Sequence, residues 1–81
     1  PVRQLRVVVD GRTYFLDLAY PQQKLAIEVD GFDFHRTRDA FDRDRARQND
    51  LVGIGWTVLR FTSRSTDREI VDAVRPFVCG P

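Results

Sequence analysis

A strand, a helix and a second strand follow one another in the middle of the chain, and this succession constrains the fold more than any other feature. The runs KLAIEVD (24–30) and WTVLRFT (56–62) are rich in β-forming residues. Residues 37–52 between them have a helical pattern, with Thr37 or Asp39 near the start and glycines after the end. Such a strand–helix–strand step predicts a right-handed parallel crossover.

Two more strands are predicted before the crossover. The runs RQLRVVV (3–9) and RTYFLDLA (12–19) flank the pair Asp10-Gly11. An Asp-Gly pair between two β-forming runs is a strong signal for a hairpin. The segment YPQQ then forms the turn into the run 24–30.

A second helix is predicted at the C-terminal end. Thr66 and Glu69 have the spacing of a capping box, and Pro76 is expected to kink or end the helix that they begin. The chain is therefore predicted to be an α/β protein with a mixed sheet, in the order β-β-β-α-β-α. Sheets with parallel strands are normally covered on both faces, and two helices are few for this purpose. We expect an N-terminal segment or a second copy of the chain to complete the cover.

The composition is that of one soluble globular domain. The 81 residues are 42% hydrophobic and 31% charged, with a net charge of +1. No apolar run approaches the roughly 20 residues of a membrane span. The single Cys79 excludes an internal disulfide, and one Cys with one His excludes a zinc finger. A reducing cytoplasm fits this composition best.

The acidic residues near the middle strand predict a metal site. The turn register places Asp17 of the second strand directly across from Glu28, with the two Cβ atoms about 5 Å apart, and Asp30 lies on the same face as Glu28. Three carboxylates so placed repel one another unless some are protonated or a cation compensates. Hard oxygen ligands suit Mg²⁺. The alternative is a solvated sheet edge, which the flanking apolar residues disfavour.

Basic and titratable residues follow the middle strand. His35 could act as a general base beside a metal site, although a lone histidine is more often a surface residue. Twelve of the thirteen cationic residues are arginine, a preference that high-GC codon usage also produces. Interleaved charges on the helix usually form a salt-bridged face, and we expect this for about half of its arginines. The expected phosphate-binding residues are Arg36, Arg38, Arg43, Arg47 and Arg60.

The pattern Asp17, then Glu28-Val29-Asp30, then helix, strand and helix resembles the PD-(D/E)XK nuclease superfamily. More narrowly, residues 12–62 resemble bacterial very-short-patch-repair-like endonuclease domains. The segment DGFDFH has the spacing of the His-Gly-x-x-x-His element of that enzyme, with Asp30 and His35 in the places of the two histidines.

The resemblance implies a restriction-endonuclease-like fold whose first helix is missing upstream. It also implies that residues 1–81 are a single nuclease-like domain from the C-terminal part of a longer protein. The implied activity is Mg²⁺- or Mn²⁺-dependent hydrolysis of phosphodiester bonds, with Asp17 and Glu28 as metal ligands. Asp30 stands where the superfamily usually has its catalytic lysine. It could assist in binding the metal or in orienting water.

Three functions are therefore considered. The first is a metal-dependent DNA endonuclease of the repair, restriction or defence type, with catalytic residues Asp17, Glu28, Asp30 and His35. The second is a nuclease-fold module that has lost catalysis and serves in binding or regulation, for example in a toxin–antitoxin or defence system. The third is an RNA or structure-specific nuclease, which the sequence does not distinguish from the first.

Overall fold

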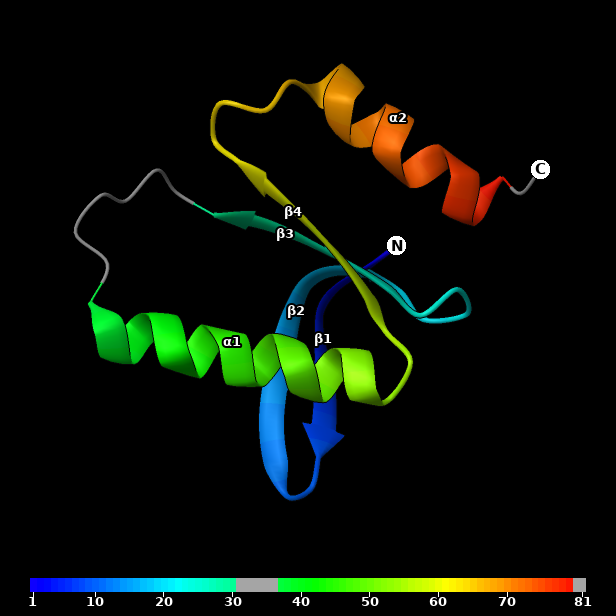
Figure 1. Cartoon of the computed structure of the whole chain (residues 1–81). Helices are drawn as coiled ribbons and strands as arrows, with labels where there is room; N and C mark the ends of the chain where they lie inside the picture. Colours follow the sequence, from blue (N-terminus) through cyan, green and yellow to red (C-terminus); the bar gives the residue numbers. More distant parts are fainter. Residues whose placement is uncertain (31–36, 80–81) are drawn as a thin grey trace.

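The computed structural model describes residues 1–30 and 37–79. Four strands and two helices form in these ranges, in the order β-β-β-α-β-α that the sequence predicts (Figure 1). The elements are β1 (Val2–Val9), β2 (Arg12–Tyr20), β3 (Leu25–Asp30), α1 (Arg38–Gly53), β4 (Thr57–Thr62) and α2 (Asp67–Val78).

The four strands form one mixed sheet in the spatial order β1-β2-β3-β4. β1 pairs with β2, and β2 with β3, in antiparallel directions, whereas β3 and β4 are parallel. The parallel pair is joined through α1, so the predicted crossover is confirmed. The fold is thus an α/β arrangement with a mixed sheet, in the order and strand directions expected.

Both turns of the antiparallel part follow from their residues. Asp10 and Gly11 have φ angles of 50° and 77°, the positive values that the tight turn of a two-residue hairpin requires and that an Asp-Gly pair tolerates. In the next turn, the Gln23 amide donates to the Tyr20 carbonyl at 3.1 Å. The following ladder aligns Leu18 with Ile27, which is the register predicted from a turn centred on Gln22-Gln23.

Each face of the sheet packs against one helix, and β3 and β4 lie between α1 and α2 (Figure 1). On the α1 face, Leu51 of the helix packs with residues from β2 and β3 and with Trp56, just before β4. This α1 core consists of Leu16, Ala19, Ala26, Leu51 and Trp56. On the other face, Val74 of α2 packs with β3; this α2 core consists of Leu25, Ile27 and Val74.

The helices begin where their capping residues predict. Thr37 caps α1, and Thr66 caps α2 by accepting a hydrogen bond from the Glu69 amide at 3.1 Å and donating one to the Glu69 carboxylate at 3.2 Å. Pro76 does not end α2, because the helix continues to Val78. No helix in residues 1–30 or 37–79 is long and apolar enough to cross a membrane.

The α2 face is incompletely covered. Val29, near the C-terminal end of β3, lies two residues after Ile27 of the α2 core and therefore on the same face, yet it is 46% exposed. The cover that α2 provides therefore stops short of the end of β3. The expectation that an N-terminal segment or a second copy completes the cover stays a prediction.

Candidate functional site

Glu28 is the one charged side chain that is buried within the described ranges, with 4% of the residue exposed. It alternates with Ile27 of the α2 core and follows Ala26 of the α1 core by two residues, so it lies on the face that α1 covers. A buried carboxylate is costly unless it has hydrogen bonds and a countercharge. The surroundings of Glu28 supply both.

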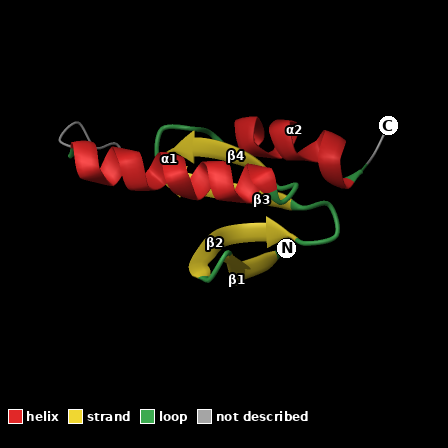
Figure 2. Cartoon of the chain, turned by 60° about the horizontal axis from the view of Figure 1, so that its bottom comes forward, coloured by secondary structure: helices red, strands yellow, loops and turns green. Residues whose placement is uncertain are grey.

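The β2–β3 register places Asp17 beside Glu28, and β2 is bent rather than flat (Figure 2). Leu16 belongs to the α1 core, whereas Leu18 packs against the α2 core, although residues two apart on a regular strand share a face. The alternation therefore reverses at Asp17. Gln4, which lies opposite Asp17 in the β1–β2 register, has φ 52°, an unusual value for a residue other than glycine. At this irregular point the Asp17 amide donates to Glu28 Oε2 at 3.4 Å.

Arg47 of α1 provides the countercharge for Glu28. Its Nη2 donates to Glu28 Oε1 and to the Phe15 carbonyl, the latter at 3.1 Å. Burial raises the pKa of Glu28, and Asp17 adds to this effect, whereas the hydrogen bond from Arg47 acts in the opposite direction. The guanidinium group of Arg47 thus favours the ionised form of the Glu28 carboxyl group, whereas burial away from water disfavours it.

A second ion pair lies beside the first. Arg60 of β4 pairs with Glu28 in the β3–β4 register, so the two residues are neighbours across the sheet. Its guanidinium forms two hydrogen bonds with the Asp44 carboxylate of α1, one of them at 2.8 Å. Its Nε is buried, has no hydrogen bond in the described part of the chain and lies 3.4 Å from Asp30 Oδ2. The bonds to Asp44 raise the pKa of Arg60 above its ordinary value.

The structure brings only some of the predicted metal ligands together. Within residues 1–30 and 37–79, no group of three His, Cys, Asp or Glu side chains is placed to hold a metal ion. Asp17 and Glu28 form a pair of neighbouring carboxylates, while Asp30 lies against Arg60. His35 lies outside the described residues.

The predicted phosphate-binding arginines differ in their surroundings. Arg47 of α1 and Arg60 of β4 are engaged by Glu28 and Asp44, respectively. Arg38 and Arg43 are exposed on α1. Arg36 lies outside the described residues.

Asp44 and Asp50 are two acidic residues of the site region whose contacts the sequence did not predict. Asp44 binds Arg60, and Asp50 accepts hydrogen bonds from Arg12 and Tyr14 of β2. One signal was available for Asp44: it precedes Arg47 by three residues and Leu51 by seven, so these three share one face of α1. Because Leu51 is fully buried, that face must point toward the sheet.

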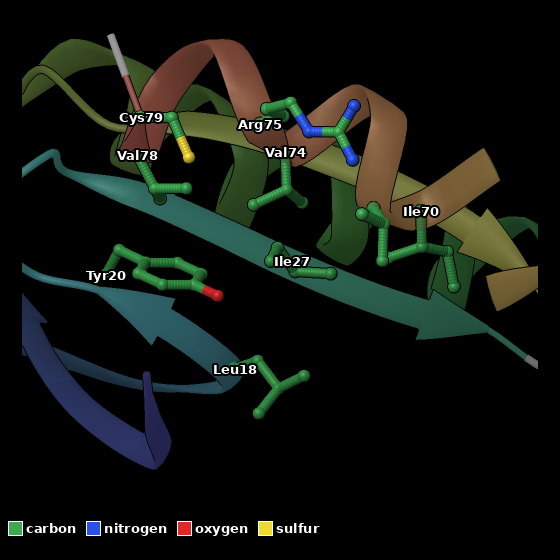
Figure 3. Close-up of a pocket in the computed structure, with 9 residues that line it drawn as sticks. Leu18, Tyr20, Ile27, Ile70, Val74, Arg75, Val78 and Cys79 are labelled. Atoms are coloured by element: carbon green, nitrogen blue, oxygen red, sulfur yellow. The ribbon is translucent and has the colours of Figure 1, made fainter. Parts of the chain in front are cut away.

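A cleft of about 250 Å³ lies on the opposite face of the sheet, between α2 and strands β2 and β3 (Figure 3). Its lining is almost entirely apolar and includes Leu18, Ile27 and Val74. The carboxylates and guanidinium groups described above lie on the α1 face. The cleft is therefore separate from the candidate site.

A mixed sheet with acidic residues on adjacent antiparallel strands and a parallel crossover defines a restriction-endonuclease-like domain of the PD-(D/E)XK kind. Residues 4–75 match the family REase_MTES_1575, and the chain belongs to this restriction-endonuclease-like family. Comparisons with curated proteins and with solved structures gave no significant match. Family membership supports a nuclease-type function in general.

Proposed function

We propose that this domain is a divalent-metal-dependent nuclease that hydrolyses phosphodiester bonds in DNA. The observation that carries the proposal is the buried Glu28 with Asp17 beside it, at the point where the β2–β3 ladder ends, in a chain of a restriction-endonuclease-like family. Replacing a buried ion pair with well-packed apolar residues often leaves the free energy of unfolding unchanged or raises it, so stability alone does not account for a carboxylate at this position. The carboxylate at this position therefore supports a functional role for Glu28.

The donor set fits a hard cation. Two neighbouring carboxylates suit Mg²⁺ or Mn²⁺, which bind proteins through few carboxylates and keep several waters for a phosphate substrate. Asp17 and Glu28 would hold the ion, and Asp30 at the end of the same strand would assist. Such an ion polarises the phosphate and neutralises charge that develops on it.

The other residues would serve substrate binding and proton transfer. His35 would accept the proton of the attacking water. Asp30 carries a negative charge where the superfamily has a lysine, so the positive charge must come from the neighbouring guanidinium groups of Arg47 and Arg60. Arg36, Arg38 and Arg43 would contact the phosphate backbone along α1.

Plasmid nicking in Mg²⁺ or Mn²⁺ tests this function. Asp17→Ala and Glu28→Ala should each lower the nicking rate at least about 100-fold, the usual scale for the loss of an electrostatic catalytic group. Asp67→Asn, an exposed acid on α2, is the matched control and should retain the wild-type rate. Equal nicking by the wild type and both alanine variants would show that a contaminating nuclease is responsible and would refute the assignment.

A second function is favoured by one specific observation. Glu28 and Asp44 are both neutralised by arginines, and Asp30 replaces the expected lysine, which suits a module that binds or regulates without catalysis. Calorimetric titration with Mg²⁺ and Mn²⁺ separates the two functions. Absence of binding up to millimolar metal would favour the regulatory module.

A further inference from the structure

Arg47 binds the Glu28 carboxylate, which a metal ion at this site would need as a ligand. The same nitrogen, Nη2, donates to Glu28 Oε1 on β3 and to the Phe15 carbonyl on β2. The Arg47 and Glu28 side chains are only 18% and 5% exposed, so little water screens their charges. A divalent cation and a guanidinium group held at one buried carboxylate would repel each other strongly.

We propose that Arg47 and the divalent cation exchange places on Glu28, and that the released guanidinium group binds the phosphate of the substrate. This inference rests on the proposed nuclease function. Before the exchange, Arg47 neutralises Glu28 and keeps the empty site stable. After it, the cation is the countercharge, and Arg47 supplies the positive charge that Asp30 cannot provide.

The contacts of the two partly buried arginines indicate why Arg47 is the one that moves. Arg60 faces two carboxylates, with paired hydrogen bonds to Asp44 and with Asp30 at 3.4 Å. Arg47 donates to one carboxylate and one neutral carbonyl. Once a cation neutralises Glu28, the attraction that holds Arg47 is largely lost, whereas Arg60 keeps its paired bonds to Asp44. A guanidinium group also binds phosphate through two parallel hydrogen bonds, which gives the released side chain a favourable new partner.

Calorimetric titration with Mn²⁺ in the absence of DNA tests the exchange. Arg47→Gln should bind Mn²⁺ about 10-fold more tightly than the wild type, because the cation no longer displaces a competitor; this corresponds to about 1.4 kcal/mol. The matched control is Arg45→Gln, which removes the same charge from an exposed position of α1, over the Phe41 ring. It should change the affinity less than about 2-fold, the scale of a screened surface charge.

Binding of a short DNA duplex adds a second readout. With Ca²⁺ as a cation that supports little cleavage, Arg47→Gln should weaken DNA binding about 10-fold, the effect of losing one charged phosphate contact. Without any divalent cation the loss should be less than about 2-fold, because Glu28 still holds Arg47 in the wild type. A loss of equal size under both conditions would overturn the exchange.

The remaining outcomes separate the exchange from the nuclease function itself. If the wild type binds Mn²⁺ and Arg47→Gln matches Arg45→Gln, the exchange is wrong and the nuclease function stands. If neither the wild type nor Arg47→Gln binds Mn²⁺ at millimolar concentrations, both proposals fail. If Arg47→Gln is unfolded without metal, Mn²⁺ should restore its folding by supplying the missing charge, and a variant that stays unfolded in Mn²⁺ would overturn the exchange.

Discussion

Glu28 is a carboxylate whose burial opposes its ionisation. Burial and the neighbouring Asp17 raise its pKa, and Arg47 offsets only part of this effect. Between the pKa of the unfolded chain and the raised pKa of the folded protein, the native state therefore binds more protons than the unfolded state. In this range the contribution of Glu28 to the free energy of unfolding falls as the pH rises.

This sign gives a prediction for Glu28→Gln, which keeps an acceptor for Arg47 but cannot ionise. The free energy of unfolding of the wild type, relative to that of the variant, should decrease as the pH rises from the ordinary glutamate pKa of 4.5 through the raised pKa of Glu28. Urea unfolding at several pH values measures the difference. Asp67→Asn should show no such trend, and a difference that grows with pH would contradict the prediction.

The pKa of Asp50 is shifted in the opposite direction to that of Glu28. The Tyr14 hydroxyl donates to it at 2.6 Å, and Arg12 donates at 2.9 and 3.0 Å. These hydrogen bonds lower the pKa of Asp50, the one from Tyr14 most. Its contribution to stability is present at neutral pH and is lost as the pH falls through the lowered pKa.

Tyr14→Phe should therefore lower the melting temperature at pH 7 by a few degrees, and the difference should shrink in strong acid. Thermal unfolding followed by circular dichroism measures it. Tyr20→Phe, on the α2 face, is the matched control and should not reproduce the pH dependence. A Tyr14→Phe difference that persists unchanged in strong acid would show that Asp50 is not the partner that matters.

At the scale of elements, α1 contributes residues both to the hydrophobic core and to the ion pairs of the candidate site. Leu51 is fully buried in the α1 core, and Asp44 and Arg47 extend the same helix face toward β3 and β4. The packing of Leu51 against the sheet therefore helps to position the side chains of Asp44 and Arg47 relative to β3 and β4. Any loss of this packing should disturb the ion pairs as well as the core.

Leu51→Ala should lower the free energy of unfolding by about 2–5 kcal/mol, the cost of a large-to-small change in a core. The adjacent Val52 is 55% exposed, and Val52→Ala is the matched control. It should change the free energy of unfolding by less than about 0.5 kcal/mol. Urea unfolding measures both values, and similar losses for the two variants would contradict the assignment of the buried face.

The elements and the site differ in how far the sequence predicts them. Each strand and helix carries its own signal, such as Asp10-Gly11 for the hairpin or Thr66 and Glu69 for α2, and these local signals sufficed for the order and the register. The partners of Arg47 and Arg60 depend on how α1 lies over the sheet. Tertiary packing decides this, and charge spacing alone gives no sign of which carboxylate on the sheet or helix each arginine meets. Asp30, the third predicted carboxylate, lies 3.4 Å from Arg60 of the neighbouring strand β4, a contact that also depends on the tertiary arrangement.

At the scale of the whole molecule, the two faces of the sheet differ in chemistry. The α1 face holds the ion pairs, and the exposed Arg38 and Arg43 lie on the helix that covers it. The α2 face holds the apolar cleft, and the α2 residues Arg68 and Arg75 both lie 3.7 Å from Asp72. A net charge of +1 gives little overall attraction to nucleic acid, so the proposed binding of DNA would depend on where the arginines lie.

The salt dependence of DNA binding tests whether the α1 face, and not the α2 face, contacts DNA. Each phosphate contact contributes about −0.9 to the slope of log K against log salt concentration, so the double variant Arg38→Gln/Arg43→Gln should make the slope less negative by roughly 1–2. The double variant Arg68→Gln/Arg75→Gln lowers the net charge equally but acts on the other face. Its slope should stay within about 0.5 of the wild-type value. Equal changes in the two double variants would mean that DNA responds to total charge, and they would contradict the proposal that the α1 face binds nucleic acid.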